Sequence, residues 1–111
     1  MNTTHKMNAS VAVAAACVLL SAPSVSAAAT DLAALSAKYN CAACHSVDKK
    51  IVGPSFKEIA AKYAGDAGAP AKLEQKVKAG GSGIWGAIPK PPNNVPDADL
   101  NALVQSILTT K

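Results

Sequence analysis

The chain lacks arginine, is poor in aromatic residues and shows no alternating strand pattern. All eleven basic side chains are lysine, and there are one Trp, one Phe and two Tyr among 111 residues. Arginine is the side chain that most often reads bases and grips phosphates, so its absence argues against a nucleic-acid-binding protein. The length allows at most one small domain, which excludes a multidomain enzyme or a doubly wound nucleotide-binding fold.

Residues 1–29 have the organisation of a secretory signal peptide. A short basic start precedes ten apolar residues at 11–20, and small residues follow that allow cleavage after residue 27, 28 or 29. Ten residues rise only about 15 Å as a helix, roughly half the hydrocarbon core, which disfavours a retained membrane helix. A lipid anchor on Cys17 is disfavoured because the apolar run continues past it. We predict export to the periplasm, a mature domain at 30–111 and no stable membrane insertion after cleavage.

Four helices are predicted in the mature domain. The first begins with Thr30 as its cap, and the second follows Ser55, which has a glutamate three positions later as in a capping box. The third covers about 70–79, and the fourth covers 97–108, where apolar residues follow the helical period. The loop at 80–96 holds four Gly, four Pro and the only Trp. A loop of this length in a small domain is usually functional.

Two cysteines and a histidine form a C-x-x-C-H motif, the pattern of c-type haem attachment. Cys41 and Cys44 can each add to one haem vinyl group, and His45 can supply an axial imidazole. A thioredoxin-like motif would need a βαβ context. A zinc site would need a fourth ligand, and residues 30–111 contain no further Cys or His. A plain disulfide would leave His45 unexplained. One covalent haem c would also strengthen the core of so short a chain.

The mature chain resembles the small bacterial class I cytochromes c of the c-551/c-552 type. The haem motif, the Gly53-Pro54 pair and the segment 83–93 carry this resemblance, in order and with matching spacing. It implies an all-α fold of about four helices around one haem. It also implies a one-electron carrier rather than an enzyme, which meets reductases or oxidases by brief docking. A monomer is the expected state of so small a carrier.

The resemblance further implies roles for three residues around the haem. Pro54 would offer its carbonyl oxygen to the second ring nitrogen of His45. The alternative is simply a turn that enters a helix, and both can hold. Trp85 would donate its indole N–H to a haem propionate, the alternative being a packing anchor in the loop. Asn93 would donate to the distal iron ligand, the alternative being an ordinary loop asparagine.

The chain departs from the family at the distal ligand. The family pattern is Ile-Pro-Met-Pro-Pro, whereas this sequence has Lys90 in the place of the methionine, and its two methionines are Met1 and Met7. Three outcomes follow: Lys90 binds the iron as an amine, solvent takes the position, or Asn93 or another loop group enters it. Removing the Lys90 proton at pH 7 costs about 4–5 kcal/mol from its reference pKa, which an iron–nitrogen bond could offset.

Ligation by Lys90 and a position open to solvent predict different chemistry. An amine favours ferric iron and lowers the reduction potential relative to Met/His ligation. A position open to solvent would bind small ligands or react with peroxide, which is the alternative function. A third interpretation is a substitution that impairs an electron carrier. Lys49, Lys50 and Lys57 could form a basic rim for acidic partners or be ordinary solvated lysines.

Overall fold

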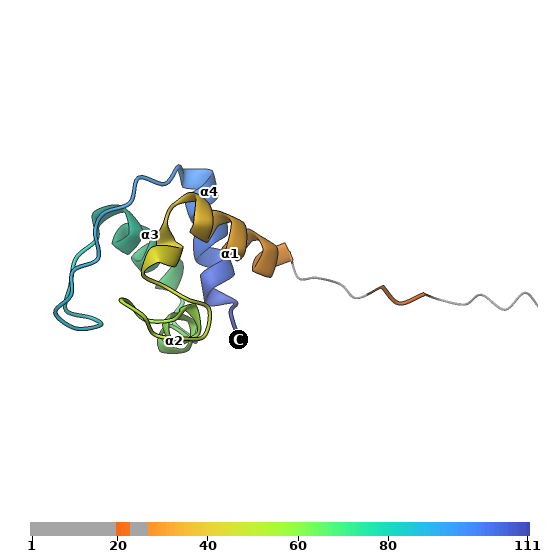
Figure 1. Ribbon diagram of the computed structural model, residues 1–111, viewed down its shortest axis with the longest axis horizontal. Helices are drawn as coiled ribbons and strands as arrows, with labels where there is room; N and C mark the ends of the chain where they lie inside the picture. The colour runs from red at the N-terminus through yellow and green to blue at the C-terminus, as the bar shows by residue number, and fades with distance from the viewer. Residues whose placement is uncertain (1–19, 23–26) are drawn as a thin grey trace, which may run out of the picture.

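The computed structural model describes residues 20–22 and 27–111 as a small helical domain (Figure 1). Its elements are α1 (Ala27–Lys38), the one-turn helix η1 (Cys41–Ala43), α2 (Phe56–Lys62), α3 (Ala69–Ala79) and α4 (Asp97–Leu108). Between residues 27 and 111 the only β-type pairing is two isolated bridges, so the predicted all-α class is confirmed. None of the described helices has the length and apolar character needed to span a membrane.

Three of the predicted helices form with nearly the expected bounds. The fourth coincides with α4, and the third begins one residue earlier than predicted, at Ala69. The predicted capping box opens α2: the Glu58 amide donates to Ser55 Oγ over 3.1 Å, and the Ser55 amide donates to Glu58 Oε2 over 2.7 Å. Two backbone donors that lack partners within the helix are thereby satisfied.

The first helix begins earlier than predicted. The prediction that Thr30 caps this helix is wrong. Helix α1 starts at Ala27, so Thr30 lies inside it. The three residues before Thr30 are alanines, which have the highest helix propensity of any residue and extend the helix toward the N-terminus. The predicted cleavage positions therefore lie in the first turn of α1. Most of the predicted leader, residues 1–19 and 23–26, lies outside the described residues.

Helix α4 forms the centre of the core, packing against α1, α2 and α3. Leu100, Leu103 and Val104 are at most 1% exposed. Their spacing of three and four residues places them on one face of the helix, as the periodicity predicts. The other buried apolar side chains of this core are Leu32, Phe56, Ile59, Leu73, Val77, Val95 and Ile107.

The loop at 80–96 leaves the helices and returns to α4 as a long excursion (Figure 1). Gly81 and Lys90 close its base by exchanging two backbone hydrogen bonds of 2.9 Å each. Nearer the tip, the Gly83 amide donates to the Gly86 carbonyl over 2.8 Å. The loop thus has a defined base, which places Lys90 next to the end of α3.

Candidate functional site

A cavity of about 330 Å³ lies between the C-x-x-C-H motif and the loop at 80–96. This volume falls within the usual range for small-molecule and cofactor sites. Six of the seven predicted site residues line the cavity, and the seventh, Asn93, contacts Lys90, which is one of the six. The six are Cys41, Cys44, His45, Pro54, Trp85 and Lys90.

The one-turn helix η1 presents the two cysteines to the cavity. Asn40 starts it in the left-handed conformation, at φ 59°. The amides of Cys44 and His45 then both donate to the Cys41 carbonyl, over 3.1 and 2.9 Å. Both cysteines are free thiols of intermediate exposure, and burial raises the pKa of the Cys41 thiol. The thiols are available for attachment at two neighbouring points of one ligand.

The His45 ring is held from two sides. Its Nδ1 lies 2.7 Å from the Pro54 carbonyl oxygen, which is the contact expected from the resemblance. A carbonyl can only accept, so Nδ1 carries the proton, and in the neutral ring Nε2 is left with the lone pair that binds a metal. The ring also stacks on Phe56 at 5.6 Å between centroids. Such an outer hydrogen bond fixes the orientation and basicity of a metal-binding imidazole.

Gly53 is required beside this ring for space rather than for backbone conformation. A Cβ atom on Gly53 would lie 2.7 Å from His45 Cε1 and 3.1 Å from His45 Nδ1. The Gly53 amide also donates to the Cys44 carbonyl over 2.8 Å. The Gly-Pro pair therefore does more than enter a helix: it allows the chain to approach the histidine and hold it.

Trp85 forms part of the cavity rim and is 42% exposed. Lys62, which the sequence did not single out, places its Nζ 5.3 Å from the centroid of the Trp85 ring. Three aliphatic side chains that line the same cavity are about half exposed or more, namely Val52, Ile84 and Ile88. An apolar rim of this kind suits a large flat ligand that covers it.

Lys90 lies on the cavity wall formed by the loop, and burial lowers its pKa. Its Nζ donates to Asn93 Oδ1 over 2.6 Å, to the Pro91 carbonyl over 2.9 Å and to the Val77 carbonyl over 3.4 Å. Asn93 was expected to donate toward the distal position. Here its oxygen accepts from Lys90, and its NH₂ group donates to the Tyr39 carbonyl over 3.3 Å.

These residues fit a covalently attached haem. Two free thiols lie at the required spacing, an imidazole has its Nε2 available, and an apolar rim needs a cover. When bound, the haem supplies a one-electron ferric–ferrous couple. Cys41 and Cys44 would hold it covalently, and His45 would offer its free Nε2 to the iron.

Comparison with known proteins gives the same assignment. The family model described as cytochrome c matches residues 29–111. Cytochrome c-551 of Azotobacter vinelandii is 56% identical over 71 residues, which cover 64% of this chain and 87% of that protein. Cytochrome c-552 of Nitrosomonas europaea is 56% identical over 78 residues, covering 69% of this chain and 76% of that protein.

Solved structures agree with this assignment. Wild-type Nitrosomonas europaea cytochrome c552 matches with a TM-score of 0.69 at 56% identity, covering 71% of this chain and 99% of that one. A class 1 cytochrome of Sideroxydans lithotrophicus ES-1 matches with a TM-score of 0.64 at 32% identity, covering 74% and 95%. The chain therefore belongs to the cytochrome c family, as a small class I c-type cytochrome that carries one haem c and transfers electrons.

Proposed function

We propose that this cytochrome is a periplasmic one-electron carrier in which Lys90 or solvent, instead of a methionine, occupies the distal side of the haem. The observation that carries the proposal is the asymmetry of the cavity. On the proximal side, His45 is held by Pro54 with its metal-binding nitrogen free. On the distal side, the wall carries Lys90, and residues 30–111 contain no methionine. The predicted leader at 1–29 supports export to the periplasm.

The rim of the cavity supports brief docking of redox partners. Those apolar side chains of the rim that the haem leaves uncovered can contact a partner near the haem edge, and a small apolar contact suits an encounter that must release quickly. Lys49, Lys50 and Lys57 are all exposed, and Lys50 also lines the cavity. We propose that these lysines attract an acidic reductase or oxidase and that the carrier acts as a monomer. Trp85 would donate its indole N–H to a haem propionate at this rim.

The distal change should lower the reduction potential. Axial ligands set haem potentials over about 0.8 V, so exchanging a thioether for an amine or solvent should move the midpoint by on the order of 100 mV. Lys90→Met should raise the potential and create the weak near-infrared band of a methionine–iron bond. Spectroelectrochemical titration of the ferric and ferrous forms measures both. A Lys90→Met variant with the native midpoint would contradict the proposed distal side.

One observation favours a second function, a haem protein open to small ligands. The three acceptors around Lys90 Nζ satisfy an ammonium group without any metal. If Lys90 stays there, carbon monoxide should bind the reduced protein rapidly at neutral pH, and peroxide should react with the ferric form. Slow carbon monoxide binding, limited by departure of an internal ligand, would exclude this function and favour Lys90 ligation. Reversible one-electron cycling without loss of the haem tests the carrier function itself.

A further inference from the structure

We propose that Asn93 and the carbonyl groups of Val77 and Pro91 form a cradle that holds the Lys90 side chain away from the haem iron in the resting protein. Asn93 is then a positioning residue that decides whether the distal side is open or filled by an amine. This inference rests on the proposed function, because it requires a distal side without a thioether. Of the two distal occupants considered there, Lys90 and solvent, the cradle favours solvent.

The hydrogen bonds of Lys90 fit an ammonium group. Such a group has three N–H donors and no acceptor, and the structure provides three oxygens at 2.6, 2.9 and 3.4 Å from Nζ. The shortest of these contacts is to Asn93 Oδ1. An amine bound to a metal keeps only two N–H groups and must leave this arrangement. The cradle and the iron therefore compete for the same nitrogen atom.

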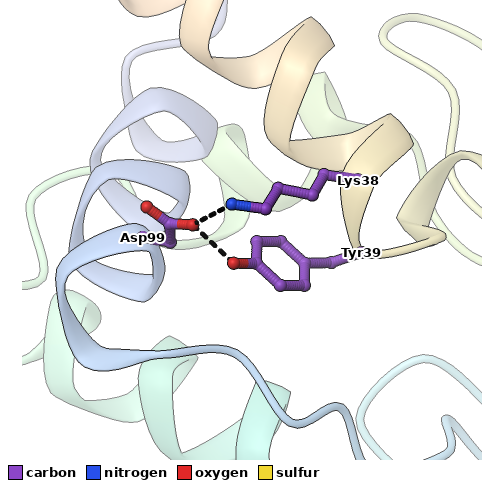
Figure 2. Close-up of polar contacts among 3 residues, drawn as sticks. All are labelled: Lys38, Tyr39 and Asp99. Carbon is purple, nitrogen blue, oxygen red and sulfur yellow. Dashed lines mark hydrogen bonds and ion pairs between the residues drawn. The ribbon is translucent and has the colours of Figure 1, made fainter.

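The cradle is anchored to three helices and does not depend on the loop alone. Val77, which lies in α3, accepts from the Asn93 backbone amide over 2.9 Å. The Asn93 NH₂ group donates to the carbonyl of Tyr39, just after α1. The Tyr39 hydroxyl in turn donates to Asp99 of α4, and Lys38 Nζ lies 2.9 Å from the same carboxylate oxygen (Figure 2). Asn93 Oδ1 is thus held in a defined place.

The Lys90 backbone is held as well, so only its side chain needs to move. Its amide and carbonyl both pair with Gly81 at the base of the loop. The side chain also lines the haem cavity. Moving from the cradle to the iron, the side chain would give one proton to solvent and displace solvent from the distal position, with no electron transferred. The cradle is the arrangement that the protein contacts favour.

The experiment uses ferric holoprotein at one neutral pH, with the native chain, Lys90→Ala, Asn93→Ala and the double variant. Spin state is read from absorption and electron paramagnetic resonance spectra, and imidazole affinity is measured by titration. The native chain and Lys90→Ala should share a high-spin spectrum and the same imidazole affinity. Asn93→Ala should become low-spin. Its imidazole affinity should fall about tenfold if Lys90 occupies nine-tenths of the sites.

The double variant separates positioning from simple loosening of the loop. If Asn93→Ala acts by releasing Lys90, adding Lys90→Ala should restore the high-spin spectrum and the native imidazole affinity. If the loop only loosens, the double variant should resemble Asn93→Ala, which would overturn the inference. Asn93→Asp loses the bond to the Tyr39 carbonyl but keeps an acceptor oxygen and adds a negative charge beside the Lys90 ammonium, so it should retain the native spectrum. The neighbouring Asn94, which is exposed, provides the matched control Asn94→Ala.

Two further results would overturn the inference. The first is a native low-spin spectrum that becomes high-spin in Lys90→Ala, since Lys90 would then bind iron with the cradle intact. The second is an Asn93→Ala variant with the native spectrum and affinity. If Asn93→Ala does not fold, Asn93→Leu removes the acceptor at similar volume and is read in the same way. None of these results tests the carrier function. That function fails only if the haem does not cycle reversibly between its two oxidation states.

Discussion

Replacing Gly80 by alanine should remove much of the stability of the domain, because this residue meets two separate constraints. Gly80 ends α3 with φ 70° and ψ −153°, a region of backbone conformation that is essentially restricted to glycine. A Cβ atom there would lie 2.3 Å from the Lys90 carbonyl oxygen and 2.9 Å from Pro91 C and Pro92 N. These are backbone atoms, which cannot rotate away as a side chain can.

The expected loss of stability has three parts. The unfavourable backbone conformation costs about 1–3 kcal/mol, and forcing extra volume into a packed site costs about 1–3 kcal/mol. Relief of the clash would separate Gly81 from Lys90 and break their two backbone hydrogen bonds, which are worth about 1 kcal/mol each. The full sum is about 4–8 kcal/mol, and the lower part of this range applies if the clash is relieved by breaking the bonds. Even that is a large share of the roughly 5–15 kcal/mol that usually stabilises a small domain.

Gly65 offers a matched control for the backbone part. It also has a positive φ, 78°, but nothing lies within 4 Å of a Cβ atom built there, so Gly65→Ala should cost only about 1–2 kcal/mol. Guanidinium unfolding of the two holoprotein variants, followed by far-ultraviolet circular dichroism, measures both losses. Equal losses in the two variants would show that the loop yields to the added methyl group, and the reasoning from the clash would be refuted.

Three other predictions concern the histidine, the α1–α4 contact and the cofactor. Gly53→Ala should push the His45 ring away from Pro54. Denaturant unfolding should show a loss of about 1–3 kcal/mol, and the ferric spectrum should change. An unchanged spectrum would show that the ring does not move. Hydrogen bonds from Tyr39 and Lys38 hold the pKa of Asp99 below its ordinary value, so its charge stabilises the fold above that value and the contribution is lost as the pH falls through the lowered pKa. Asp99→Asn should therefore lower the melting temperature at neutral pH and match the native protein in strong acid; a deficit that persists in acid would assign the effect to packing. Haem removal should abolish most helical circular dichroism, because the apolar side chains that pack against the haem become exposed to water and the remaining core is small.

Much of the fold could be predicted from the sequence because the signals are local. The period of α4, the Ser55–Glu58 capping box and the glycines after α3 act through residues within a few positions of one another. The same holds for the C-x-x-C-H motif. The predicted start of α1 was wrong because the alanines before Thr30 favour the helix and extend it to Ala27.

The sequence by itself determined the haem chemistry, because the C-x-x-C-H motif is local, and it predicts a distal side without a thioether, because residues 30–111 contain no methionine. Only the tertiary structure decided what surrounds Lys90. Its side chain bonds to Val77 of α3, 13 positions away, and its near neighbour Asn93 is bonded in turn to Tyr39, 54 positions away. Hydrogen bonds between such distant residues leave no periodicity or spacing in the chain, because they depend on how the helices pack.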